Sequence, residues 1–475
     1  MAVAMCTTTE YLMTPEERDC PKSHGVDSCW HVAILAGCVA FLSSAPQSVS
    51  GFFYVGFMEE FGVNRESASW PSNAMAALAH LSGIFLAVLQ HRITLFQILF
   101  VGGVLLWTGI LASAFVPNMT YMTVTFGIIH GLGYGLCIMT LNVLLNMYFD
   151  RYRALTSGIY YSGMSCSGLA FPKFLAYLQQ KYGFRGTLLI YGGITMHVTA
   201  FGLLLKEPPW MCLKQYAKKE RYPILEGTRG IQYQLANPDQ HKGSPTSGNH
   251  ERSRNLPSLL LLLRKPMFYV ILSCAAIGDM IFSVFTSTMV DYGLDKGLSI
   301  SDAEFLIIYG SCANIAGRLL VPLLADAKWI QRSTLVMINI VIASGSMILM
   351  SYTILYAHVL FVCLCVYISL GFLTSMKSVL MADYLGIEWM STSYAVVGLI
   401  LLPLTIITPS IIGFFRDFGG SYDGLYRMYG AILLLLFGAF LFVVCVERSR
   451  NHVWTTGQNA QEATQLTSAE QTRNT

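Results

Sequence analysis

The chain has 475 residues, of which 54% are hydrophobic and only 12% are charged. This is about half the charged fraction of an ordinary soluble domain, and a water-soluble fold of this size could not bury so much apolar surface. The formal net charge of +3 is small, and there is no basic stripe of the kind that a phosphate backbone requires. The composition therefore predicts a protein embedded in a lipid bilayer and excludes nucleic acid as a partner.

Several kinds of site are missing from the sequence. Most of the twelve cysteines lie in apolar runs, without the spacing of a zinc site or of a disulfide framework. There is no nucleophile–base cluster and no glycine-rich nucleotide loop. We therefore expect no enzyme, no metal and no cofactor. The first 29 residues are polar and do not resemble a cleavable signal peptide.

Twelve apolar runs are long enough to cross the hydrocarbon core of a bilayer, which takes about 20 helical residues. Six precede residue 206 and six follow residue 266, in the order 30–53, 70–90, 93–115, 120–147, 154–178, 187–205, 267–290, 303–325, 333–355, 358–382, 391–415 and 424–446. The sequence therefore predicts an all-α membrane protein with twelve transmembrane helices in two halves of six.

The polar segments give the predicted domain organisation. A cytoplasmic tail (1–29) precedes the first half (30–205), a cytoplasmic central loop (206–266) is partly disordered, and the second half (267–446) leads into a cytoplasmic tail (447–475). Lysine and arginine favour cytoplasmic loops, and with the N-terminus inside, 21 of the 30 Lys and Arg residues fall on that side and six outside.

The most informative segment opens the fifth span. It reads Tyr148-Phe149-Asp150-Arg151-Tyr152-Arg153, followed by Gly158 and further glycines. Here Arg151 and Arg153 are placed to pair with acids or anionic lipid, and the glycines allow close helix approach. The segment resembles a signature of the monocarboxylate transporter family (solute carrier family 16), which belongs to the major facilitator superfamily.

A second hallmark of that family precedes its first span, and here it is degraded to Asp27-Ser28-Cys29-Trp30-His31-Val32, which keeps Asp27 and Trp30. The resemblance is that of a divergent member. It implies a major facilitator fold and carrier-mediated movement of a small organic anion across the plasma membrane by alternating access. It also suggests a single-span accessory membrane protein as a partner.

Arg318 lies near the middle of the eighth span, where a charge costs about 2.5–3.5 kcal/mol even on a lenient insertion scale. Its planar fork suits a carboxylate held by two parallel hydrogen bonds. The resemblance agrees, because the family places its substrate-binding arginine here. The alternative is an interhelix contact with a buried acid or with backbone carbonyls.

Two further cations, Lys173 and Lys377, fall within spans. Each is either an additional cation that binds the solute or a side chain that extends its charge to the membrane surface or pairs with a nearby acid. Asp279 is the candidate partner, because it is the acid well inside the seventh span.

Two departures from the family bear on coupling. Proton-coupled lactate-type members carry a lysine after the proline of the first span and an aspartate one turn before the arginine of the eighth. Here those substrate-site positions are Gln47 and Asn314, and neither side chain exchanges a proton near neutral pH. We therefore expect a carrier that is not proton-coupled in the lactate-type manner. The alternative function is a non-transporting membrane sensor or scaffold, which the degraded first hallmark favours.

Overall fold

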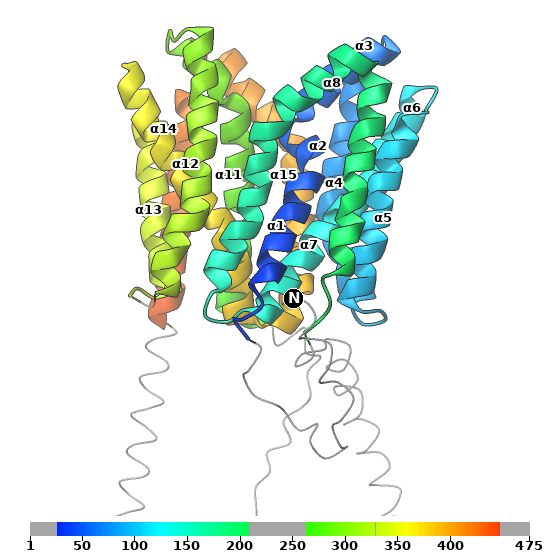
Figure 1. The fold of residues 1–475 in the computed structure, drawn as a ribbon. Coiled ribbons are helices and arrows are strands. Elements are labelled where there is room, and N and C mark those ends of the chain that lie inside the picture. The colour runs from blue at the N-terminus through cyan, green and yellow to red at the C-terminus, as the bar shows by residue number, and fades with distance from the viewer. Residues whose placement is uncertain (1–25, 209–262, 328, 447–475) are drawn as a thin grey trace, which may run out of the picture. The chain divides into compact units, whose positions relative to one another are not determined.

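A computed structural model describes the chain over residues 26–208 and 263–446, with residue 328 left out. Most of the two predicted tails and of the predicted central loop lies outside the described residues. Within them, all the regular secondary structure is helical (Figure 1).

The helices of the first part of the chain follow one another with short connections. They are α1 (Trp30–Ser43), α2 (Ala45–Ser48), α3 (Ser50–Phe61), α4 (Arg65–Leu89), α5 (Leu95–Ser113), α6 (Met119–Met122), the π-helix η1 (Thr123–His130), α7 (Gly131–Tyr148) and α8 (Arg153–Leu203).

The second part has the same character. Its helices are α11 (Pro266–Asp295), α12 (Ile300–Asp326), α13 (Arg332–Met350), α14 (Tyr356–Leu380), the π-helix η2 (Met381–Leu385), the 3₁₀-helix η3 (Ile387–Trp389), α15 (Met390–Gly413), the π-helix η4 (Phe414–Phe418) and a last helix, Asp423–Val446.

Ten helices among the described residues are long and apolar enough to cross a membrane. Nine of these helices each correspond to one predicted span. The remaining three predicted spans, the first, fifth and sixth, differ from the prediction at two local breaks. The first span is divided into α1, α2 and α3, where Pro46 stands in the first turn of α2 and supplies no amide for the preceding helix. The fifth and sixth spans are the two parts of the 51-residue α8, which breaks at Gly183 (φ 71°, ψ 175°), a backbone conformation open to glycine alone.

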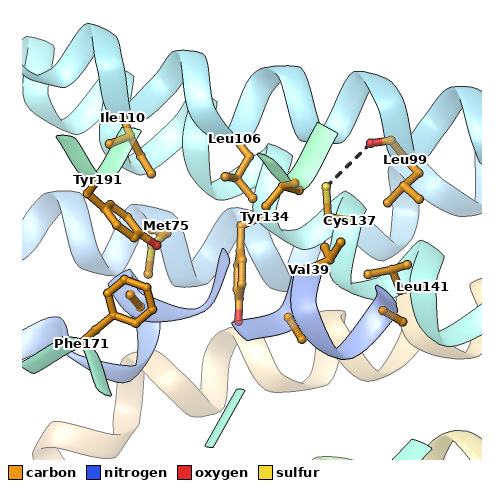
Figure 2. Close-up of a cluster of buried hydrophobic side chains, with 14 of the residues drawn as sticks. Val39, Met75, Leu99, Leu106, Ile110, Tyr134, Cys137, Leu141, Phe171 and Tyr191 are labelled. Atoms are coloured by element: carbon orange, nitrogen blue, oxygen red, sulfur yellow. Dashed lines mark hydrogen bonds between the residues drawn. The ribbon is translucent and has the colours of Figure 1, made fainter. Parts of the chain in front are cut away.

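The described chain packs into two compact units. The first contains residues 26–208 together with Arg318–Ala327 and Met381–Leu402. Its core draws side chains from most of its helices, among them Val39 (α1), Met75 (α4), Leu106 (α5), Cys137 (α7) and Tyr191 (α8), which Figure 2 shows. The core explains why α1, α7 and α8 lie side by side (Figure 1), because each contributes buried apolar side chains to it.

The second unit contains residues 263–317, 329–380 and 403–446. Polar side chains inside it bond to backbone carbonyls of neighbouring helices. The Tyr292 hydroxyl donates to the Met350 carbonyl at 2.6 Å, and the Asn339 amide donates to the Ser369 carbonyl at 2.9 Å. Such bonds add to van der Waals packing in holding helices together where there is no hydrophobic driving force.

Candidate functional site

The first hallmark segment and the fifth-span signature meet at one turn. Residues 149–152 form the α7–α8 turn, and Asp27 folds against it in a left-handed conformation (φ 65°). The Asp27 carboxylate accepts hydrogen bonds from three consecutive backbone amides of this turn, at N···O distances of 3.1, 3.2 and 3.2 Å, those of Asp150, Arg151 and Tyr152. The two residues kept from the hallmark both contact the turn, since the Trp30 ring lies 5.4 Å from the rings of Phe149 and Tyr152.

Arg153 connects the start of α8 to a segment from the second half of the sequence. Its Nε donates to the Phe149 carbonyl at 2.8 Å, and one terminal guanidinium nitrogen donates to the Asp383 carboxylate at 2.8 Å. Asp383 lies in η2, which belongs to the first unit. The Arg153 side chain is 13% exposed, so this ion pair is shielded from much of the screening that weakens surface pairs.

A second carboxylate meets α8 close to the same point. The Asp326 side chain, at the end of α12, accepts a hydrogen bond from the Leu155 amide at 2.8 Å and is buried. The first amides of a helix have no partner within the helix and carry a partial positive charge, so an acceptor there is stabilising. Asp326 was not among the predicted site residues, although its position as an acid at the end of a predicted span was visible in the sequence.

The remaining signature residues also have defined contacts. The Tyr148 hydroxyl donates to the Lys206 carbonyl at 2.8 Å, and the Arg151 guanidinium lies 5.3 Å from the centre of the Tyr152 ring. Gly158 faces the backbone of α12 so closely that a Cβ atom there would collide with the carbonyl oxygen of Arg318. This glycine therefore permits the approach of α8 and α12.

Arg318 is buried, with 3% of its surface exposed. One of its terminal nitrogens donates to the Tyr161 carbonyl on α8, and the guanidinium lies 5.7 Å from the centre of the Tyr161 ring. The interhelix contact with a backbone carbonyl, one of the two interpretations of Arg318, is thus present. It is compatible with the other interpretation, because a guanidinium has five N–H donors.

Tyr161 and Tyr134 interact with this arginine, and two further buried tyrosines, Tyr160 and Tyr394, belong to the same unit. The Tyr160 and Tyr161 rings lie 4.8 Å apart, and the Tyr160 hydroxyl donates to the Ile138 carbonyl at 3.0 Å. Electrostatic interactions connect Tyr134 with Arg318 and Tyr161, and Tyr160 with Tyr394. A fixed cation among phenol groups is suited to holding a carboxylate, since both groups donate hydrogen bonds to oxygen.

The other predicted substrate residues have varied surroundings. Gln47 (α2) and Lys173 (α8) have exposed side chains, and within the described part of the chain neither forms a hydrogen bond or an ion pair. Asn314 is buried and donates to the Tyr367 carbonyl of α14 at 3.1 Å. The Lys377 ammonium lies 2.7 and 2.6 Å from the two carboxylate oxygens of Asp279, so the predicted pairing is present.

Comparisons with known proteins identify the family of the chain. The model of the Major Facilitator Superfamily matches residues 36–407. Monocarboxylate transporter 4 of Gallus gallus is 25% identical over 88% of this chain and 84% of its own length. Monocarboxylate transporter 1 of Bos taurus is 25% identical over 88% and 85%, and monocarboxylate transporter 12-B of Danio rerio is 23% identical over 90% of each chain.

Two solved structures share the fold. The transporter FucP, in an outward conformation, has a TM-score of 0.63 with 13% identity and covers 87% of this chain and 98% of its own. The proton:xylose symporter XylE has a TM-score of 0.62 with 14% identity and covers 87% and 94%. These likenesses confirm the predicted fold and a multi-pass membrane protein, and the family consists of carriers rather than enzymes. The chain belongs to the Major Facilitator Superfamily, as a divergent member whose curated relatives are monocarboxylate transporters.

Proposed function

We propose that this protein carries a small organic anion, a monocarboxylate or a related solute, across the plasma membrane by alternating access between its two six-helix halves. Arg318 binds the carboxylate in this proposal. The supporting observation is a buried arginine, eight residues or about 12 Å of helix from the end of α12, which interacts with Tyr161 and Tyr134. The curated relatives support the solute class by their names.

The contacts at the α7–α8 turn support a moving carrier over a scaffold. Asp27 and Trp30 are the residues that the degraded hallmark keeps, and they are also the ones that contact the turn. The Arg153–Asp383 pair joins segments from the two halves of the sequence. In the proposed cycle the Arg153–Asp383 pair forms when the cytoplasmic end is closed and separates when it opens.

The absence of lactate-type proton coupling is proposed from two side chains that do not titrate. Gln47 and Asn314 stand where lactate-type carriers have a lysine and an aspartate, and the Asn314 amide is engaged with the Tyr367 carbonyl. We therefore propose a carrier without lactate-type proton coupling. We also propose that both termini lie in the cytoplasm. A single-span accessory membrane protein is the further proposed partner.

Uptake into oocytes tests the carrier against the scaffold. Labelled pyruvate, lactate, an aromatic amino acid and creatine are offered to cells in which surface expression has been verified. The proposal predicts saturable uptake of at least one carboxylate above the level of uninjected cells. Flat uptake across this panel, with the protein at the surface, would favour the sensor or scaffold.

A further inference from the structure

An ion pair joins two membrane spans of the second unit, with Asp279 in the middle of α11 and Lys377 in the last turn of α14. Asp279 is 13 residues from the start of α11 and 16 from its end, which leaves about 20 Å of helix on either side. Lys377 of α14 reaches it, with its Nζ atom 2.6 Å from one carboxylate oxygen and 2.7 Å from the other. A charge at the depth of Asp279 is retained for a reason, because its insertion is unfavourable.

The exposure of the pair separates it from a sealed structural contact. The side chains of Lys377 and Asp279 are 14% and 26% exposed, whereas Arg318 is only 3% exposed. Neither charged group is sealed inside the protein. A lysine ammonium is a compact point charge with three rotatable donors, so it can exchange one carboxylate for another without a change in the backbone.

We propose that Asp279 is an internal counter-ion that competes with the transported anion for Lys377. The Asp279 carboxylate belongs to the same chemical class as the solute and holds the ammonium while no solute is bound. A carboxylate solute that reaches Lys377 displaces it. This inference rests on the proposed function, because the competitor is the carried carboxylate.

The counter-ion role predicts opposite effects for the two partners. Asp279→Asn removes the competitor but keeps the shape of the side chain, so the half-saturation concentration for labelled pyruvate or lactate falls about tenfold. Lys377→Gln raises it at least tenfold, and Lys377→Arg, which keeps the charge, restores uptake. A pair with a purely structural role would give no gain of affinity in Asp279→Asn.

The chain contains a matched control. Lys296 and Asp423 form an ion pair at 3.0 Å with side-chain exposures of 18% and 23%, at helix ends of the same unit. The Tyr292 hydroxyl also contacts Asp423 at 3.4 Å, as part of a packing network. Lys296→Gln should leave the half-saturation concentration within about twofold of the wild-type value, because a partly exposed pair at a helix end contributes little.

The experiment measures concentration-dependent uptake in oocytes, normalised to the surface level of each variant. An unchanged or raised half-saturation concentration in Asp279→Asn overturns the inference. If that variant does not reach the surface, the double variant Asp279→Asn/Lys377→Gln decides, because it leaves no charge without a counter-ion. If the double variant has the same half-saturation concentration as the wild type, the inference is overturned. If the double variant loses uptake, the inference is supported. Wild-type protein that takes up neither anion contradicts the proposed function, and the inference falls with it.

Discussion

A single carboxylate satisfies three backbone amides at the α7–α8 turn. Asp27 is the first residue of the degraded hallmark, and its three acceptor contacts span 3.1–3.2 Å. Hydrogen bonds to a charged acceptor are stronger than neutral ones. The side chain therefore fixes the start of α8 at the point where Arg153 and Asp326 make their contacts.

We expect Asp27→Ala to destabilise the protein by about 2 kcal/mol, because the turn loses its charged acceptor. The measurement is the thermal unfolding of purified protein in detergent. Asp150→Ala is the matched control, since the Asp150 side chain is 72% exposed and its pair with Arg153 at 3.2 Å is worth about 0–1 kcal/mol. Equal unfolding temperatures for the two variants would refute a fixing role for Asp27.

At this scale the sequence predicted some contacts and missed others. Arg318 was identified because a charge within an apolar run is unfavourable to insert into the membrane and is therefore usually functional. Asp279 was named as a partner for Lys377, and the structure places the two in contact. Asp326 was missed, because it accepts a hydrogen bond from a backbone amide. Almost every residue has such an amide, so the sequence does not indicate which one the carboxylate contacts.

At the scale of elements, α8 is the helix on which the site is organised. It begins at the α7–α8 turn, passes the Arg318 backbone at Gly158 and presents Tyr161 to the arginine. Small residues let helix backbones approach within a membrane, and side chains added at such points must displace the neighbour.

Gly158→Ala should lower both the surface level and the transport rate, because the new Cβ atom would overlap the Arg318 carbonyl. The cost expected for such overpacking is about 1–3 kcal/mol. Gly193, also in α8, is the control, since a Cβ atom there meets nothing within 4 Å and alanine favours the helix. Uptake by Gly158→Ala that matches uptake by Gly193→Ala would show that the close approach is not required.

The spans themselves were predictable from apolar length, and their breaks were not. The run 30–53 indicates one helix by composition, but Pro46 divides it and the helical structure continues to Phe61. The runs 154–178 and 187–205 were correctly separated, since the segment Arg153–Leu203 breaks at Gly183, which lies between them. Hydropathy reports how much apolar surface a segment has, and backbone dihedral angles depend on contacts that it does not record.

At the scale of the whole molecule, the orientation depends on charge. The predicted cytoplasmic side holds 21 Lys and Arg residues, against six outside. Tags inserted at residue 240 and at the C-terminus should therefore be inaccessible to antibody in intact cells and become accessible after permeabilisation. Labelling of either tag from outside would reverse the orientation.

Coupling is also a property of the whole transport cycle. Proton symport needs a group whose protonation changes, and Arg318 stays charged at any physiological pH. With the membrane potential clamped, uptake should show little dependence on an imposed pH gradient beyond the ionisation of the solute itself. Intracellular pH recorded during uptake should not fall with it. Acidification in one-to-one proportion to uptake would assign the proton to another group in the spans.

The most direct test of the central claim compares Arg318 variants in a concentration series of a labelled monocarboxylate, with uptake corrected for surface level. Arg318→Lys keeps the charge but loses the fork, and Arg318→Ala loses both. The control is Arg427→Lys, because the Arg427 guanidinium is exposed and donates to the Asp423 carbonyl of its own helix at 3.3 Å. Losing one charge-assisted contact costs about 1.5–3 kcal/mol, which predicts at least a tenfold loss of affinity in both Arg318 variants and none in the control. Wild-type uptake by Arg318→Lys and Arg318→Ala at low solute concentration would contradict the assignment of Arg318 to the carboxylate.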